Sequence, residues 1–171
     1  AEIDNAAEFR YRQPVIDDET LVVSVAQSGE TVDTLWAMEE ARAAGCPQLT
    51  VCNTPGAQST RVADGTLLMR AGPEIAVAST KTMLGSMIAL HALALHLGRV
   101  RGTLDEAVEA EQVAAALRAP AAIGQALLLE PRIAQLASRY AQREDFLFLG
   151  RGLSLPVALE GALKLKEVSY I

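Results

Sequence analysis

The chain has 171 residues and a formal net charge of −6; half of its residues are hydrophobic and 21% are charged. These values are typical of a folded protein of one domain or slightly more, and they argue against intrinsic disorder. The sequence shows no basic stripe, which excludes a typical nucleic-acid-binding surface. Any anion therefore has to be bound by a local arrangement of groups and not by the overall field of the protein.

The start of the chain and its cysteine content bear on location. The first residues, AEIDNAAEFRYR, lack the apolar segment of a secretory signal. Cys46 and Cys52 are the only cysteines in the sequence, and their spacing matches neither a zinc site nor a redox motif. We expect two buried thiols in a reducing compartment, and therefore a cytoplasmic protein.

Over residues 20–98, apolar runs typical of strands alternate with segments at helical spacing. The predicted elements, in chain order, are a strand over 20–26, a helix over 31–44, a strand over 48–53, a short helix over 57–64, a short strand over 66–69 and a long helix from about 78 to 98. Another short helix is expected in AAEFRYR, before Pro14. Because strands alternate with helices, the pattern predicts an α/β fold with a parallel sheet covered on both faces.

The second part of the chain has a different texture. Residues 103–143 are rich in Ala, Leu and Gln and are interrupted at Pro120 and Pro131, which predicts two or three linking helices. The segment DFLFLGRG then repeats the opening pattern of strand, glycine turn and helix, with a helix from about Leu155. We predict a first lobe over residues 1–100, connecting helices over 101–143 and the beginning of a second lobe over 144–171.

The segment MLGSMIALHALALHLG, residues 83–98, is apolar enough to require a membrane test. It contains His91 and His96 and falls short of about 20 uninterrupted apolar residues, so a membrane span is not expected. A core helix and a subunit interface explain the segment comparably well. The two histidines are five positions apart, so they do not share a helical face and do not form a metal pair.

A polar turn, AQSGET at residues 26–31, lies where the first strand is expected to end and the next helix to begin. In a parallel sheet ligands bind beyond the carboxyl ends of the strands, and a helix N-terminus there favours an anion. Gln27, Ser28 and Thr31 would add an amide and two hydroxyls, and Gly29 would let the backbone approach closely. Simple helix capping by Ser28 or Thr31 explains the same residues about equally well. The Walker A and dinucleotide glycine patterns are both missing, which disfavours a nucleotide.

A charged stripe is expected on the last helix. In LPVALEGALKLKEVSYI, Glu160, Lys164 and Glu167 are spaced by four and three residues and fall on one helical face. On spacing alone, a solvated face is the favoured interpretation. The alternative is that the stripe faces a ligand crevice, where a carboxylate beside a lysine could move a proton next to a sugar carbon.

Three segments in this order, AQSGETVDTL, AGPEIAVASTK and FLGRGLSLPVALEGALKLKEVSYI, resemble the isomerase half of the glucosamine-6-phosphate synthase family. This family is also called glutamine–fructose-6-phosphate aminotransferase (isomerizing). EFRYR, at residues 8–12, fits the same family, and the similarity runs over essentially the whole chain. The resemblance implies the sugar isomerase (SIS) fold, a flavodoxin-like three-layer αβα sandwich around a parallel sheet, present twice in the isomerase half.

The resemblance also implies a function. The family converts fructose 6-phosphate and ammonia to glucosamine 6-phosphate, a step of hexosamine biosynthesis, with no metal or organic cofactor. A separate glutaminase domain delivers the ammonia, and family members pair as dimers, so a homodimer without nucleic-acid or membrane partners is expected.

The candidate site has eight residues. The resemblance implies substrate binding for Gln27, Ser28, Thr31, Val77 and Ser79 and catalysis for Lys164 and Glu167, and Gly29 joins the substrate-binding set because it lets the backbone approach closely. In the family the polar turn holds the sugar phosphate, and the stretch around residues 77–79 borders the sugar. The glutamate moves the proton between C1 and C2, and the lysine assists near the ring.

Several features depart from the family pattern. Ala26 stands where the family usually has a serine, so one phosphate-side hydroxyl is lost and another sugar remains open. The resemblance also implies a glutaminase domain, a preceding strand with further phosphate-side hydroxyls, and later segments that carry a histidine and a lysine. The 171 residues contain none of these, so we expect an incomplete isomerase module that is inactive on its own.

Two other functions remain open. A sugar-phosphate-binding regulatory SIS module would normally carry a helix-turn-helix, and the sequence shows no basic recognition helix. A standalone amino-sugar-phosphate deaminase or deglycase would keep Glu167 and the polar turn without using a glutaminase domain. The alanine at position 26 is compatible with this second alternative.

Overall fold

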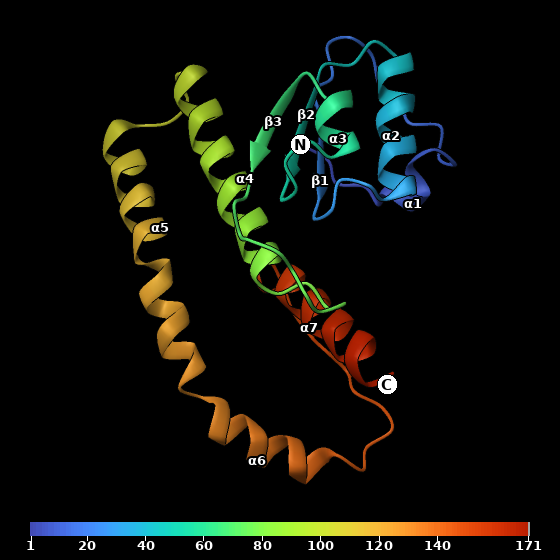
Figure 1. Ribbon diagram of the computed structural model, residues 1–171. Coiled ribbons are helices and arrows are strands. Elements are labelled where there is room, and N and C mark those ends of the chain that lie inside the picture. The colour runs from blue at the N-terminus through green and yellow to red at the C-terminus, as the bar shows by residue number, and fades with distance from the viewer. Residues whose placement is uncertain (171) are drawn as a thin grey trace. The chain divides into compact units, whose positions relative to one another are not determined.

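A parallel three-stranded sheet forms the centre of the first half of the chain (Figure 1). In the computed structural model, which describes residues 1–170, the strands are β1 (Val22–Ala26), β2 (Gln48–Cys52) and β3 (Gly65–Leu68). The strands lie in the order β1-β2-β3, with Ala26 opposite Cys52 and Cys52 opposite Leu68. Their carboxyl ends therefore meet at one edge, as the sequence pattern predicts.

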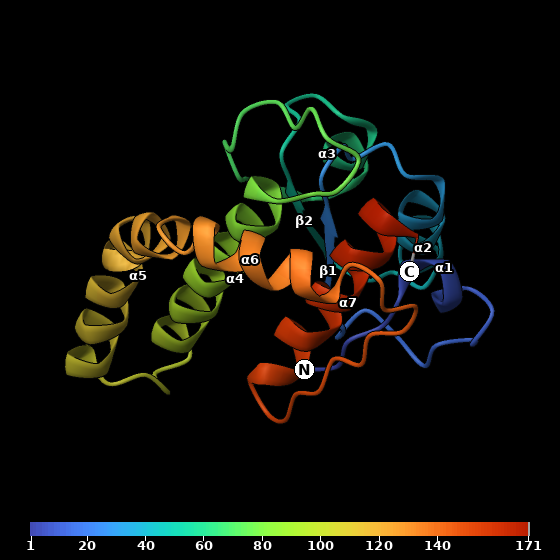
Figure 2. The same ribbon diagram turned by 90° about the horizontal axis from the view of Figure 1, so that it is seen from below.

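Helices cover both faces of this sheet. The helices of the first half are α1 (Ala6–Phe9), α2 (Val32–Ala43), α3 (Gln58–Val62) and α4 (Lys81–Val100). Figures 1 and 2 show α2 and α3 on one side of the strands and α4 on the other. The predicted α/β fold with helix, sheet and helix layers is confirmed, and the predicted element boundaries agree to within a few residues.

The short helix α1 is held against α2 by an aromatic contact. The guanidinium of Arg10 lies 4.4 Å from the ring centroid of Trp36, a distance at which a cation is attracted to the ring face. This contact gives EFRYR, which also fits the family pattern, a structural role.

Small and medium-sized side chains make the core, because the chain has few aromatic residues. Most of the deeply buried residues lie on β2 and on the inner face of α2: Met38, Ala41, Thr50, Val51 and Cys52. Ser59 of α3 and Thr82 of α4 are buried to the same degree. Both cysteines are free and buried, as predicted. Burial, followed by the nearby Asp17 and Asp18 carboxylates, raises the pKa of the Cys46 thiol and keeps it protonated.

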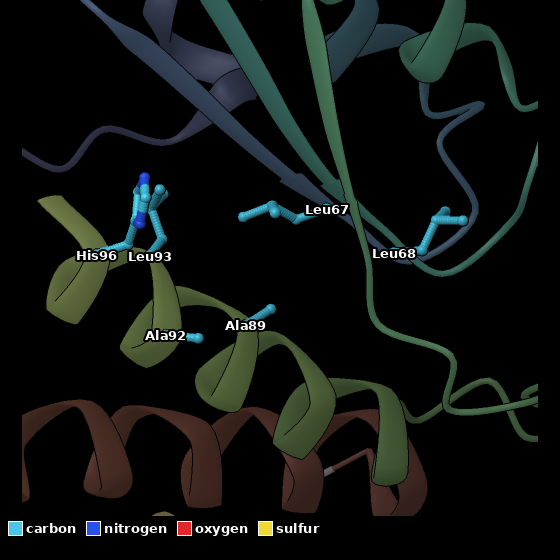
Figure 3. Close-up of a pocket in the computed structure, with 6 residues that line it drawn as sticks. All are labelled: Leu67, Leu68, Ala89, Ala92, Leu93 and His96. Carbon is cyan, nitrogen blue, oxygen red and sulfur yellow. The ribbon is translucent and has the colours of Figure 1, made fainter. Parts of the chain in front are cut away.

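One face of α4 packs toward the sheet. A Cβ on Gly85 would lie 3.2 Å from Cβ of Met69, so the glycine permits a close approach at this point. Further along the helix a hollow of about 310 Å³ separates α4 from β3 (Figure 3), lined by Leu67, Leu68, Ala89, Ala92, Leu93 and His96. This lining is apolar apart from His96, so the hollow is unsuited to a phosphate.

The chain divides into two compact units, residues 1–103 and residues 104 onward. The second unit contains α5 (Glu106–Leu127), α6 (Glu130–Tyr140) and α7 (Ser154–Ser169). Pro131 lies in the first turn of α6, where its missing N–H has no intrahelical partner to lose. Pro120 lies inside α5, so the predicted interruption at that position is wrong. The linking region has two helices, which is within the predicted two or three. The division into 1–100, 101–143 and 144–171 stays a prediction.

The strand predicted in DFLFLGRG is also wrong. Residues 145–150 have no strand pairing, and the described residues of the second unit contain no other strand with which they could pair. An extended segment needs a neighbour for its backbone groups before it becomes a strand. Phe148 instead packs on α7, since a Cβ on Gly161 would lie 3.0 Å from its ring.

Among residues 1–170, α4 is the one helix long and apolar enough to cross a membrane. A second candidate arises if α5 and α6, which are bent by 52° at their junction, count as one span. Only length and composition support these assignments, and the core helix of a soluble protein passes the same test.

The packing of α2 on the sheet generates the first prediction. Met38 is 1% exposed, so Met38→Ala should lower the free energy of unfolding by about 2–5 kcal/mol, through lost burial and the cavity left behind. Met38→Leu conserves volume and should cost less than about 1.5 kcal/mol. Urea unfolding followed by circular dichroism measures both. Equal effects of the two variants would show that the site is not tightly packed.

Candidate functional site

The polar turn between β1 and α2 presents its side chains at the carboxyl edge of the sheet. Gln27 and Thr31 are exposed, and Ser28 is half-buried. Thr31 is the N-cap residue of α2, yet its side chain makes no capping hydrogen bond within the described chain. Ser28 Oγ accepts a hydrogen bond of 3.2 Å from the backbone N–H of Glu30. Helix capping therefore does not account for Thr31, whose hydroxyl remains available to a ligand.

Gly29 has a conformation and an environment that exclude a side chain. Its φ of +71° lies in the left-handed region. A Cβ at this position would lie 2.5 Å from Ser59 Oγ and 2.7 Å from both Ala57 Cβ and Cys52 Sγ. The turn is thus pressed against β2 and the start of α3, which fixes its path.

Hydrogen bonds from the end of β2 and from the start of α3 hold the same turn. The backbone N–H of Asn53 donates to the Gln27 carbonyl at 3.2 Å, and that of Ser59 donates to the Gly29 carbonyl at 3.0 Å. The Glu30 carboxylate accepts from the backbone N–H of Gln58 at 2.8 Å. No local sequence pattern predicts these contacts, because they join segments that only the sheet brings together.

Asn53 extends this connection to the third strand end. Its side-chain amide donates to the Gly72 carbonyl at 2.7 Å, and its amide oxygen accepts from the N–H of Ala71 at 2.9 Å. Asn53 therefore joins the loops that follow β1, β2 and β3. The signal that could have revealed it is a polar residue directly after a buried strand, in the segment QLTVCN.

The loop after β3 carries Val77 and Ser79. Glu74 anchors it by accepting from the Thr82 backbone at 3.1 Å and the Thr82 hydroxyl at 2.7 Å, at the start of α4. The hydrogen bond from the Thr82 side chain is the main reason that the pKa of Glu74 is lowered. Ser79 Oγ is hydrogen-bonded to Thr82 Oγ1, while Val77 is 94% exposed.

The charged stripe on α7 is a connected ion-pair cluster. Lys164 Nζ lies 2.6 Å from Glu167 Oε2 and 3.5 Å from Glu160 Oε1. The three side chains are 25–30% exposed, so the stripe is not the fully solvated face that spacing favoured. The hydrogen bond with Glu167, opposed by burial and helped by the Glu160 charge, raises the pKa of Lys164 and keeps it protonated.

The candidate residues thus fall into two groups. Gln27, Ser28, Gly29 and Thr31 lie together beside the start of α3 in the first unit, and the loop carrying residues 77–79 is tied to the same strand ends through Asn53. Lys164 and Glu167 lie together on α7 in the second unit. Within residues 1–170 no group of three or more His, Cys, Asp or Glu side chains could hold a metal ion.

Comparison with known proteins gives one family and a consistent set of relatives. A model of the SIS domain matches residues 1–96. The chain is 51% identical, over 96% of its length, to a glutamine–fructose-6-phosphate aminotransferase [isomerizing] of Leifsonia xyli subsp. xyli, and 48% identical, over 99%, to one of Pseudomonas syringae pv. tomato. It spans 27% and 28% of the lengths of these two relatives.

Solved structures agree in fold. The C-terminal domain of glucosamine-fructose-6-phosphate aminotransferase from Francisella tularensis matches with a TM-score of 0.96 and 37% identity, over 99% of this chain and 48% of that one. A putative phosphosugar isomerase from Silicibacter pomeroyi matches with a TM-score of 0.79 and 26% identity, over 97% of this chain and 48% of that one.

The environment of Gly29 generates the second prediction. Gly29→Ala should lower the free energy of unfolding by the left-handed backbone cost of about 1–2 kcal/mol plus the cost of displacing its neighbours. Gly56→Ala is the matched control, because Gly56 has a similar φ of +75° but no atom within 4 Å of the point that a Cβ would occupy. Thermal and urea unfolding of both variants measure the difference. Equal losses would mean that the contacts around Gly29 impose no constraint.

Proposed function

The chain belongs to the SIS domain family, and from that premise we propose that it is part of the isomerase half of a glutamine–fructose-6-phosphate aminotransferase. Such an enzyme makes glucosamine 6-phosphate from fructose 6-phosphate and ammonia. The observation that carries the proposal is the turn at residues 27–31. It presents an uncommitted hydroxyl and an amide at the N-terminus of α2, held in place by contacts with the next strand end.

In this proposal the turn binds the phosphate group. The free N–H groups of the first turn of α2 and its dipole favour an anion, the dipole alone by about 0.3–1 kcal/mol. The Thr31 hydroxyl has no capping partner in the described chain, and Ser28 Oγ accepts one hydrogen bond and can still donate another. Gln27 adds an exposed amide donor. No lysine is needed, which suits an acidic chain.

Proton transfer is the role we propose for Glu167 and Lys164 of the ion-pair cluster on α7. The Glu167 carboxylate takes a proton from C1 of the fructosimine, formed by loss of water from ammonia and the ketose, and returns a proton at C2. Lys164 is protonated and holds the Glu167 carboxylate at 2.6 Å, which fixes the direction of its free lone pairs. Val77 and Ser79 border the sugar. The exposed Val77 side chain offers an apolar contact.

The remaining components are proposed from the family resemblance. A glutaminase domain supplies the ammonia, the enzyme works as a cytoplasmic homodimer, and no metal or organic cofactor takes part. A regulatory SIS module would bind the same phosphate without turnover, and a deaminase or deglycase would turn over without glutamine. Assays of sugar-phosphate turnover by the full-length protein, with and without glutamine, distinguish these three functions. Turnover that needs glutamine indicates the aminotransferase, turnover without it the deaminase or deglycase, and binding without turnover the regulatory module.

The third prediction tests phosphate binding. Ser28→Ala and Thr31→Val should each weaken binding of fructose 6-phosphate by about 1–2 kcal/mol, because each removes a hydrogen bond to a charged group. Thr66→Val, on the exposed side of β3, and Ser138→Ala, on α6, are matched controls away from the turn. Calorimetry on the 171-residue chain measures the affinities. Unchanged affinity in both turn variants would remove the turn from the site.

The fourth prediction tests proton transfer. In a full-length enzyme that contains this chain, Glu167→Gln should keep sugar-phosphate binding and lose turnover by at least about a hundredfold, because an amide cannot carry the proton. Glu160→Gln is the matched control, since Glu160 belongs to the same ion-pair cluster. Steady-state kinetics and calorimetry separate the two effects. Turnover that survives in the Glu167 variant, or equal losses in both, would contradict the assignment.

A further inference from the structure

An anion-binding turn that contains a carboxylate poses a physical problem. Glu30 lies between Gly29 and Thr31, directly beside the groups proposed to bind the phosphate. A negative charge at that point would repel a sugar phosphate and compete for the same N–H groups. Unless the side chain is directed elsewhere, Glu30 should therefore weaken the site that surrounds it.

The structure directs this carboxylate to another helix. Glu30 Oε1 accepts a hydrogen bond of 2.8 Å from the backbone N–H of Gln58, the first residue of α3. Next to it, the N–H of Ser59 donates to the Gly29 carbonyl at 3.0 Å. Two adjacent residues of the turn are thus bonded to two adjacent N–H groups of α3.

The sequence of α3 leaves its first turn without a side-chain cap of its own. Its N-cap residue is Ala57, whose methyl side chain cannot accept a hydrogen bond from the first turn. Helix N-termini need an acceptor for their free N–H groups, and a carboxylate is a favourable one because it also complements the helix dipole. Glu30 supplies from the neighbouring loop the cap that Ala57 lacks.

We propose that Glu30 is a positioning residue for the anion site: by capping α3 it holds the turn at residues 27–31 in its binding conformation and keeps its own charge away from the ligand. This inference rests on the proposed function, because the ligand is the sugar phosphate assigned there. It gives the glutamate of the turn a role through another helix, without contact to the substrate.

Three substitutions separate the cap from the charge. Glu30→Ala removes both, and Glu30→Gln removes the charge but keeps an amide oxygen that can accept the same hydrogen bond. Gln58→Pro keeps the charge and removes the N–H donor. Proline is tolerated at the first helical position, and the preceding Ala57 has a ψ of 159°, which a following proline accepts. Gln58→Ala, which keeps the N–H, is the matched control for the proline.

Positioning and simple repulsion predict opposite signs. If Glu30 acted only through its charge, Glu30→Ala would bind fructose 6-phosphate more tightly than the original chain. Positioning instead predicts weaker binding by at least about fivefold in Glu30→Ala, a larger loss in Gln58→Pro, where the freed carboxylate also repels, and a smaller loss in Glu30→Gln. Calorimetry with fructose 6-phosphate and inorganic phosphate, and fructose as the uncharged control, measures this order.

Hydrogen exchange in the ligand-free chain gives a second readout. Glu30→Ala and Gln58→Pro should speed exchange of the amides of residues 28–32 by at least about fivefold. The β2 amides in these variants, and the amides of residues 28–32 in Gln58→Ala, should exchange at unchanged rates. Tighter binding in Glu30→Ala, or unchanged exchange in the turn, overturns the inference. If the original chain binds neither phosphate probe, the proposed function fails. The exchange result then decides by itself whether Glu30 holds the turn.

Discussion

The close contact of Gly29 with β2 and the start of α3 is the constraint on which the rest of the candidate site depends. A left-handed φ and the surrounding Ser59, Ala57 and Cys52 atoms leave no room for a side chain. The backbone of the turn therefore packs closely against the end of β2 and the start of α3, and the Gly29 carbonyl accepts from the N–H of Ser59. Because these contacts fix the turn on one side, its hydroxyls and the N-terminus of α2 are presented in one arrangement.

An anion site is strengthened when the carboxylates beside it are directed elsewhere. The two glutamates in the loops at the strand ends meet this condition in the same way. Glu30 accepts from the first N–H of α3, and Glu74 accepts from the backbone and side chain of Thr82 in α4. Glu30 thereby stabilises α3, which lies further along the chain, and Glu74 stabilises α4, which follows its own loop. The N-terminus of α2, whose N-cap side chain makes no such bond in the described chain, is left for a ligand.

The α7 cluster uses charge differently. Lys164 lies between two glutamates, and its raised pKa reflects mainly the short contact with Glu167. A pair that is 25–30% exposed is neither screened like a surface ion pair nor desolvated like a core pair. Such an intermediate environment holds the carboxylate in a defined orientation while leaving it accessible, as a group that exchanges a proton with a substrate requires.

The sequence by itself determined the order of the elements, the parallel sheet and the placing of the polar turn, because these follow from local periodicity and from the rule that parallel strands end at one edge. It could not determine whether DFLFLGRG forms a strand, since an extended segment becomes a strand only beside a partner strand. The described residues of the second unit contain no such partner. Only the tertiary structure showed that Asn53 joins three loops and that Glu30 caps α3, not α2. Both depend on residues 18 to 28 positions apart in the chain, whose meeting is decided by strand pairing and not by any local pattern.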